Sequence, residues 1–307
     1  MYDVKDPRSV LAATPAKEKR PANAFAAAEY ARFYQSEPVE SGPAGETWYA
    51  RGQNFVLALT KATPGAEFTR KDQPDEYVVV IRDPDTPIEV AANGETASVP
   101  GFSLVIVPPG DSTVTVPNGG ELVRLFTVRS ADLAAKCENA DAYAEAHPNI
   151  PPFEPWPEPP GGFKIRQYSL DVPKQDGRFG RIFRCTTFMV NYLDEQIGPR
   201  DITALSPHFH DDFEQCSLAL HGAFMHHIRW PWTKDMNTWR DDDHEHCGSP
   251  SIAVIPPPAI HTTRAVDEGE NQLVDIFCPP RSDFSKQPGW VLNADDYPMP
   301  ANGSGDG

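Results

Sequence analysis

The most informative segment of the sequence is Pro-His-Phe-His-Asp-Asp-Phe-Glu, residues 207–214, which lies in a β-rich part of the chain. Side chains alternate between the two faces of a strand, so His208 and His210 point the same way, and Glu214 can join them after a bend. His261, on a later predicted strand, can supply a fourth donor. Imidazoles with one carboxylate suit a divalent first-row metal, so the segment predicts a metal site with two octahedral positions left open.

The sequence around this stretch repeats an earlier part of the chain. Glu-Leu-Val-Arg-Leu-Phe at 121–126 is similar to Gln-Leu-Val-Asp-Ile-Phe at 272–277, and proline-rich strands precede them at 104–112 and 253–261. An internal repeat of this length predicts two domains of like plan.

Composition indicates that both domains are all-β. The 307 residues include 33 Pro and 21 Gly, which favour short strands and turns over long helices. In the first half, short β-rich runs are bounded by Gly, Pro, Asn or Asp and fit a small sandwich or barrel; they are 55–61, 76–81, 87–91, 103–107 and 122–128.

His-X-His-X3-Glu, followed by Gly222 and a proline-rich strand ending at His261, resembles the signature of the cupin superfamily. The resemblance implies two RmlC-like β-barrels over about residues 50–285, a bicupin. It also implies that His208, His210, Glu214 and His261 are the metal ligands. One departure is visible: seven residues separate Glu214 from Gly222 where six are usual, which we interpret as a bulge in the turn.

The predicted organisation is a short N-terminal arm (1–47), a degenerate barrel (48–148), a proline-rich linker (149–162), a metal-binding barrel (163–290) and a flexible tail (291–307). Within the arm, 22–34 is alanine-rich and predicts a helix of about three turns, which we expect to pack on a partner subunit.

The first repeat has lost the metal-binding residues. Alignment of Glu76 with Glu214 puts Arg70 and Asp72 where the histidines stand, and Ser112 takes the place of His261. A cation and a hydroxyl cannot replace three imidazoles, so the N-terminal barrel is predicted to be metal-free.

Several other residues are candidates for the site. Strand alternation counted from Glu214 places Cys216, Leu218 and Leu220 inside the barrel as an apolar wall. The next strand offers either His227 with Arg229 or His226 on the opposite face, and the sequence leaves this parity open. Arg229 can hold a substrate carboxylate. The candidate catalytic residues are His227, Arg229 and Tyr192.

The second barrel carries an insertion within 230–247, whose tryptophans Trp230, Trp232 and Trp239 predict a lid or a subunit contact. Asp241 to Cys247 is rich in metal-binding residue types, but its spacing fits no standard site, and we interpret it as a solvated acidic loop.

Charge and composition also exclude classes of function. With 27 Lys and Arg against 44 Asp and Glu, the net charge is −17, which disfavours nucleic acid and anionic membranes as partners. No apolar run reaches the roughly 20 residues of a membrane span, the N-terminus is too charged for a secretory signal, and five dispersed Cys suggest reduced thiols. We expect a cytoplasmic homodimer that acts on a small molecule.

The resemblance implies a metal-dependent enzyme but leaves the reaction open. The apolar wall favours an enolic or aromatic substrate and hence a dioxygenase. A non-redox isomerase or lyase of the keto-deoxyuronate isomerase type is the alternative, and a ligand-binding or storage cupin is the third. The cofactor is one divalent transition metal per chain, iron by preference, with manganese, nickel or zinc as alternatives.

Overall fold

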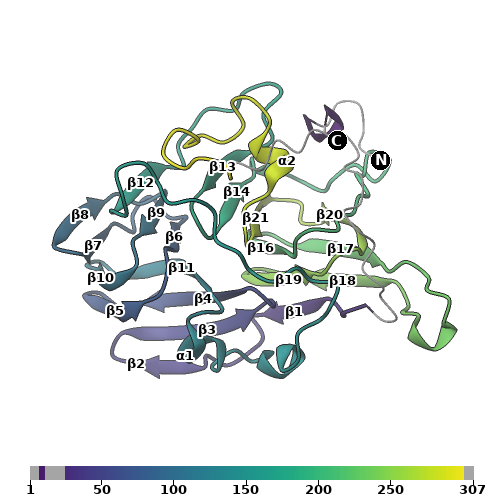
Figure 1. The fold of residues 1–307 in the computed structure, drawn as a ribbon, viewed down its shortest axis with the longest axis horizontal. Coiled ribbons are helices and arrows are strands. Elements are labelled where there is room, and N and C mark those ends of the chain that lie inside the picture. Colours follow the sequence, from purple (N-terminus) through teal and green to yellow (C-terminus); the bar gives the residue numbers. More distant parts are fainter. Residues whose placement is uncertain (1–6, 11–24, 301–307) are drawn as a thin grey trace.

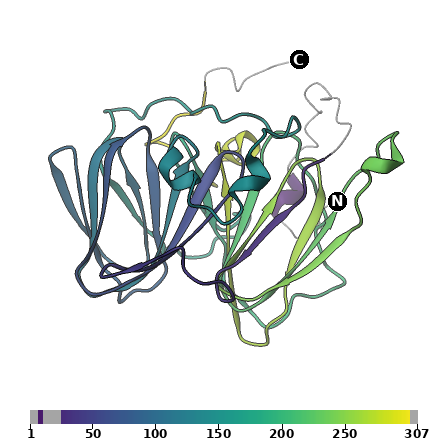
Figure 2. The same cartoon turned by 90° about the horizontal axis from the view of Figure 1, so that it is seen from below.

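The computed structural model describes residues 7–10 and 25–300, and it is all-β with two barrels side by side (Figures 1 and 2). Each barrel has one large and one small antiparallel sheet. The predicted fold class is therefore confirmed: two cupin-type jelly rolls occur in one chain.

The N-terminal barrel has a large sheet and a four-stranded small sheet. In spatial order, the large sheet is β12 (Arg166–Ser169), β9 (Ser103–Val107), β6 (Tyr77–Ile81), β11 (Gly120–Thr127), β4 (Phe55–Ala62), β3 (Gly45–Arg51) and β2 (Glu40–Gly42). The small sheet is β5 (Ala66–Gln73), β10 (Gly110–Val116), β7 (Ile88–Ala92) and β8 (Glu95–Val99).

The C-terminal barrel repeats this plan. Its large sheet is β1 (Glu29–Arg32), β19 (Ser251–Ile255), β16 (Gln215–His221), β21 (Glu270–Phe277), β14 (Met189–Tyr192) and β13 (Arg181–Arg184), with β15 (Gln196–Ile197) on β21. Its small sheet is β18 (Asp243–Cys247), β17 (Phe224–Arg229) and β20 (Ile260–Ala265). The short helices are η1 (Pro7–Val10), α1 (Ala131–Ala134), η2 (Ala140–Tyr143), η3 (Met236–Thr238) and α2 (Ser282–Ser285).

The two barrels exchange edge strands. β1 comes before the N-terminal barrel in the chain but pairs with β19 of the C-terminal barrel, and β12 comes after the linker but pairs with β9. Each barrel is thus completed by a strand from the other half of the sequence, which fixes the barrels to each other.

The predicted alanine-rich helix is wrong for the residues that are described. Residues 29–32 form strand β1, while 22–24 lie outside the described residues. Helix propensity is worth less than about 1 kcal/mol per residue, and here the backbone hydrogen bonds to the edge of β19 outweigh it. The strand packs within its own chain, and the homodimer stays a prediction.

Two further segments are more ordered than the sequence suggests. Residues 291–300 of the predicted flexible tail pack on the barrels, since Tyr297 is buried and donates a hydrogen bond to Glu76. Asp243 to Cys247 form strand β18 rather than a loop, and the acidic side chains of Asp243 and Glu245 bind Tyr30 and Arg32 of β1.

The large sheets of the two barrels face each other across a shared hydrophobic core. Leu57 and Val80 of the N-terminal barrel belong to the same buried cluster as Leu218 and Val274 of the C-terminal barrel. Alternate residues of these strands therefore point into the core between the barrels, and only the intervening ones point into a barrel. None of the helices in the described part of the chain is long and apolar enough to span a membrane.

Candidate metal centre

Three histidines gather at one end of the C-terminal barrel, as the sequence predicted. His208 and His261 are joined by two backbone hydrogen bonds of 3.0 and 2.8 Å, and their ring centroids are 4.4 Å apart. The ring of His210 lies 5.0 Å from that of His261 and 6.2 Å from that of His208. The predicted histidine group is therefore assembled from the loop before β16 and the start of β20.

The hydrogen bonds of the three rings fix their tautomers. Nδ1 of His208, His210 and His261 lies 2.9, 3.0 and 3.0 Å from the backbone oxygens of Ser206, Phe213 and Ala259, respectively. A carbonyl oxygen only accepts, so each Nδ1 carries the proton and donates it. Each Nε2 is left with a lone pair, as in histidines that bind metals.

The fourth member of the group is Gln215, which the sequence pattern did not single out. Its Oε1 lies 3.2 Å from Nε2 of His210 and 3.3 Å from Nε2 of His261. Its amide nitrogen donates to Ser217 and to Asp275 Oδ1, at 3.0 and 3.1 Å, which keeps the oxygen turned toward the imidazoles. The unprotonated Nε2 atoms of His210 and His261 therefore face the side-chain oxygen of Gln215 with no hydrogen atom between them.

Glu214 is not brought to the histidines. It is buried between the barrels, where its Oε2 accepts a hydrogen bond of 2.8 Å from the backbone of Gln53. Gly52 permits this approach, because a Cβ there would lie 2.2 Å from Glu214 Oε2. Burial raises the pKa of Glu214 to about 7.

The prediction of Glu214 as a ligand was wrong because it assigned Glu214, rather than Gln215, to the inner face of the strand. β16 starts at Gln215, so Gln215 points into the barrel and Glu214 points the other way. The signal was in the spacing: six residues separate Gln215 from Gly222, the number usual in the family. No bulge before Gly222 is needed to explain the count.

Within residues 7–10 and 25–300, no three His, Cys, Asp or Glu side chains are placed to hold a metal ion by themselves. A metal here would depend on the amide of Gln215 as well. Three imidazole nitrogens and an amide oxygen are donor types that first-row divalent metals accept, so the chemistry of these side chains suits such an ion.

Burial and nearby cations keep the imidazoles neutral. Desolvation holds the pKa values of His208 and His210 well below the usual range and lowers that of His261 to about 4. The charges of two buried arginines, Arg8 and Arg281, act in the same direction.

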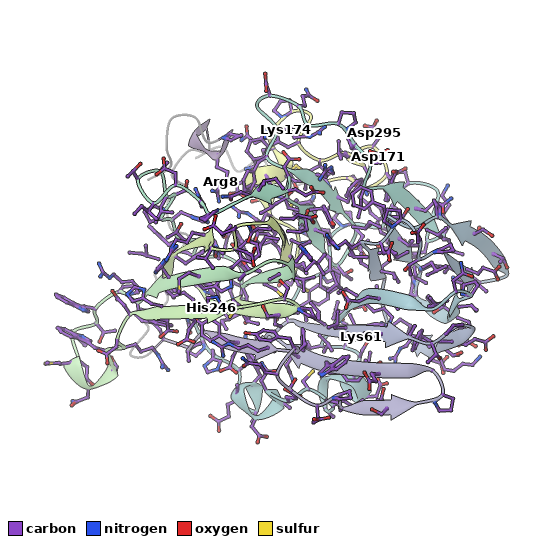
Figure 3. The ribbon with its side chains drawn as sticks, turned by 180° about the vertical axis from the view of Figure 1, so that it is seen from behind. Arg8, Lys61, Asp171, Lys174, His246 and Asp295 are labelled. Carbon is purple, nitrogen blue, oxygen red and sulfur yellow. The ribbon has the colours of Figure 1, made fainter. Side chains whose placement is uncertain are left out.

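Neither arginine carried a signal in the sequence. Arg8 lies on η1, close to α2 (Figure 3), with its guanidinium carbon 4.3 Å from the ring centroid of Phe179. Arg281 precedes α2, lies over the ring of Phe284 at 3.6 Å and pairs with Asp283. Both are brought to the barrel by the tertiary fold, far in sequence from the His-X-His segment.

The predicted apolar wall faces the other way. Cys216, Leu218 and Leu220 belong to the core between the barrels, because they share the parity of Glu214. The interior face of β16 carries Gln215 and Ser217 instead. Ser217 donates to Asp275, which also accepts from Gln215, so the wall beside the histidines is polar.

The sequence left open which of the neighbouring residues His226 and His227 is on the inner face of β17, and in the structure His226 is the buried one. His226 is opposite Thr263 in the sheet, with Nδ1 3.0 Å from its hydroxyl, and only 1% of the residue is exposed. Its Nε2 has no hydrogen-bond partner in the described part of the chain. Burial and the neighbouring His261 lower its pKa to about 3, so the ring is neutral.

The structure does not bring the three residues predicted to be catalytic to the histidines. His227 points outward, where it lies 2.8 Å from His244 and accepts from Arg264. Arg229 has an exposed side chain that binds Asp242. Tyr192 packs in the core between the barrels, with its ring edge-on to Phe102.

Two further features lie away from the histidines. A cavity of about 550 Å³ lies between the barrels and includes Arg82, Gly222 and Glu270 in its lining. The predicted lid projects from the C-terminal barrel between β17 and β18, and Trp232 is stacked on Trp239 with 77% of Trp232 exposed.

Comparison with known proteins supports the fold. No protein-family model and no curated protein sequence matches the chain. Among solved structures, oxalate decarboxylase from Lactobacillus farciminis, determined as a formate complex, matches with a TM-score of 0.56 and 11% identity over 85% of this chain and 87% of that one. A single-residue variant of the oxalate decarboxylase of Bacillus subtilis matches with a TM-score of 0.56 and 10% identity, over 84% and 81%.

AerE from Microcystis aeruginosa has a TM-score of 0.55 and 9% identity, and the match covers 84% of this chain and all of AerE. At such low identities the matches show the architecture alone. The chain thus has the two-barrel cupin fold.

Proposed function

We propose that the C-terminal barrel binds one divalent transition metal and that the protein is a metal-dependent enzyme. The donors would be Nε2 of His208, His210 and His261 and Oε1 of Gln215. The observation that carries this proposal is the contact of unprotonated imidazole nitrogens with a carbonyl oxygen at 3.2 and 3.3 Å. Acceptors at this distance repel each other unless a cation lies among them.

A metal bound here would polarise a substrate oxygen as a Lewis acid. The protein's own residues would position and hydrogen-bond the substrate. His226 would offer Nε2 to it, since this atom is buried and has no partner among the described residues, while Thr263 fixes the ring through Nδ1. Asp275 would hold Gln215 in place.

The polar interior favours a non-redox lyase or isomerase. The preference for a dioxygenase depended on the apolar wall of Cys216, Leu218 and Leu220, and these residues face the other barrel. Hydroxyl, carboxylate and imidazole groups line the interior in its place. Two of the solved structures with this fold are named as oxalate decarboxylases, which is consistent with non-oxidative chemistry on this scaffold.

A dioxygenase is the second candidate. Four protein donors leave two positions of an octahedral metal open, which is the number that a substrate and O2 need. Iron, the metal preferred from the sequence, belongs to this candidate, while zinc would suffice for the first.

The test compares zinc-loaded with iron-, manganese- and nickel-loaded protein over a panel of small carboxylates, enols, catechols and uronates, with and without oxygen. We expect turnover that persists with zinc under strict anaerobiosis. Turnover that requires both oxygen and a redox-active metal would establish the dioxygenase instead. No turnover by any metal-bound form would favour the binding or storage protein.

His226→Gln tests the proposed role of this residue, and His227→Gln is its matched control on the opposite face of the same strand. We expect the first to reduce turnover about 10²-fold or more with metal content unchanged, and the second to leave turnover intact. Equal activity of the two variants would remove His226 from the reaction.

A further inference from the structure

One interior position carries opposite charges in the two barrels. In the repeated segments 121–126 and 272–277, Arg124 aligns with Asp275. Both side chains face the interior of their own barrel, because their neighbours in the sequence belong to the core between the barrels. The N-terminal barrel therefore has a cation at the place where the C-terminal barrel has a carboxylate.

Arg124 is enclosed by the N-terminal barrel, and only 7% of the residue is exposed. Ala58 of β4 lies between Arg124 and Tyr49 of β3 in the sheet, and its small side chain leaves the guanidinium room to extend toward Tyr49. The guanidinium carbon is 4.3 Å from the ring centroid of Phe68 on β5. Arginine keeps its proton in proteins, so titration does not remove this buried charge.

The guanidinium makes few hydrogen bonds for a buried group. Nη2 donates to the Thr60 hydroxyl at 3.0 Å, and the Tyr49 hydroxyl, which itself donates to Glu40, also lies within reach of the side chain. Nε is buried and has no partner in the described part of the chain. A buried N–H on a charged group is unfavourable without an acceptor, so this edge of Arg124 suits an acceptor from a ligand.

The charged groups that face Arg124 leave one positive charge in excess. Arg70 is paired with Asp132 through two hydrogen bonds of 2.6 and 2.9 Å. Glu40 is paired with Lys136 at 2.7 Å. Each of these two carboxylates thus has a cation of its own, and within residues 7–10 and 25–300 Arg124 makes no ion pair. A buried charge in this state is costly unless a counter-ion joins it.

We propose that the N-terminal barrel has an anion-binding site at Arg124 and that its ligand is a small monocarboxylate. The planar guanidinium matches the two oxygens of a carboxylate, and one negative charge balances the charge that the neighbouring ion pairs leave. A dianion would instead leave a buried negative charge in excess. This site is separate from the proposed metal centre and does not depend on it.

The test measures acetate binding to the full-length protein by isothermal titration calorimetry, with chloride at equal ionic strength as the control. We expect one equivalent of acetate to bind at this site and chloride to bind at least about tenfold more weakly, because it lacks the paired oxygens. Arg124→Met keeps the length of the side chain without its charge, and affinity should fall at least about 100-fold. Arg229→Met, on the outer face of β17, is the matched control and should leave affinity unchanged. Absence of acetate binding, or equal binding by Arg124→Met, would overturn the proposal.

A purely structural role for Arg124 makes a different prediction. If this residue only packs on Phe68 and binds Thr60, acetate should shift the urea midpoint of neither the wild type nor Arg124→Met. For a ligand site, acetate raises the midpoint of the wild type and leaves that of Arg124→Met unchanged. Should Arg124→Met fail to fold, Arg124→Lys keeps the charge without the planar fork, and we expect its acetate affinity to fall at least about tenfold. Unchanged affinity in Arg124→Lys would contradict the site.

Two further results separate this site from the metal centre and fix the charge of its ligand. His261→Ala removes a proposed metal donor and should leave the Arg124-dependent binding of acetate unchanged. Acetate binding that is lost in His261→Ala and retained in Arg124→Met would place the ligand in the C-terminal barrel and overturn the proposal. Tighter binding of sulfate than of acetate would contradict a site for a single negative charge.

Discussion

The two barrels share one plan but differ in what their interiors contain. Tyr77 and Gln215 are the first residues of equivalent strands, and Ser112 and His261 occupy equivalent positions on β10 and β20. In the N-terminal barrel the Tyr77 hydroxyl lies 3.0 Å from Ser112, and the Tyr77 ring stacks on Phe126. In the C-terminal barrel the corresponding contact joins Gln215 Oε1 and His261 Nε2, 3.3 Å apart, which are two of the proposed metal donors.

The rest of the interiors follows the same division. The N-terminal barrel is filled by aliphatic side chains such as Val79, Val105 and Val114. The C-terminal barrel has Ser217, Asp275 and His226 inside. In the N-terminal barrel a hydroxyl pair and an aromatic stack occupy these positions, whereas in the C-terminal barrel Nε2 of His210 and of His261 faces the side-chain oxygen of Gln215. The comparison shows that one barrel plan accommodates either an apolar, packed interior or a polar group of histidines at equivalent positions.

In contrast to the interior residues, the glutamate that precedes each of these strands, Glu76 before β6 and Glu214 before β16, is present in both halves of the chain. Glu76 accepts from the backbone and side chain of Thr186 in the C-terminal half, and Glu214 accepts from Gln53 in the N-terminal half. Each carboxylate binds the other barrel. Their shared role is to connect the barrels rather than to bind a metal.

The largest expected effect is on metal affinity. His261→Ala removes a donor, and we expect the affinity for a divalent metal to fall at least about 100-fold. Ser112→Ala, its equivalent in the other barrel, should leave one equivalent of metal bound. Titration with metal followed by elemental analysis gives both results. Loss of metal from Ser112→Ala would mean that the barrels do not differ as described.

A second effect is on stability. Glu214→Ala leaves the partly buried backbone N–H of Gln53 without its acceptor, and we expect the unfolding free energy to fall by about 1–3 kcal/mol. The variant should still bind one metal ion. Chemical denaturation and metal analysis of the same sample check both points, and loss of metal with normal stability would restore Glu214 as a ligand.

The pH dependence of stability gives a third test, in the N-terminal barrel. Burial, as the largest cause, raises the folded-state pKa of Glu76 above 4.5, while hydrogen bonds from Thr186 act against it. Its contribution to stability is therefore complete below pH 4.5 and declines as the pH rises through the folded-state pKa. The unfolding free energy of the wild type should fall relative to that of Glu76→Gln over this range. If the unfolding free energy of the wild type instead rose relative to that of Glu76→Gln as the pH increased, the pKa of Glu76 would be lowered in the folded state and the prediction would be wrong.

The smallest effect is expected on the outer face of β17. Arg229→Ala should change the unfolding free energy by no more than about 0.5 kcal/mol, because its partner Asp242 is also at the surface. Metal content and turnover should stay at wild-type values. A loss of turnover would return Arg229 to the site where the sequence pattern had placed it.

Much of the fold follows from local sequence patterns. The repeat at 121–126 and 272–277, the proline-rich strands and the His-X-His spacing are sufficient for two barrels and for the histidine group. These patterns are not sufficient to predict strand β1. Its alanine-rich segment becomes a strand only because it pairs with β19, which is more than 200 residues away in the sequence. Tertiary pairing outweighs local propensity here.

The details of the site depend on parity, which one residue can reverse. Because the alternation was counted from Glu214 instead of Gln215, Cys216, Leu218 and Leu220 were predicted to face the barrel interior and Ser217 was not. The choice between His226 and His227 needed the register of β17 with β20. Arg8 and Arg281 come from segments outside the barrel strands, and no local pattern predicts where such segments pack.

The most direct test of the central claim is an anomalous-scattering map from crystals of the protein loaded with cobalt. We predict one strong peak per chain, about 2.0–2.3 Å from Nε2 of His208, His210 and His261 and from Oε1 of Gln215. A peak bound by the Glu214 carboxylate, or a second one beside Tyr77 and Ser112 in the N-terminal barrel, would contradict it.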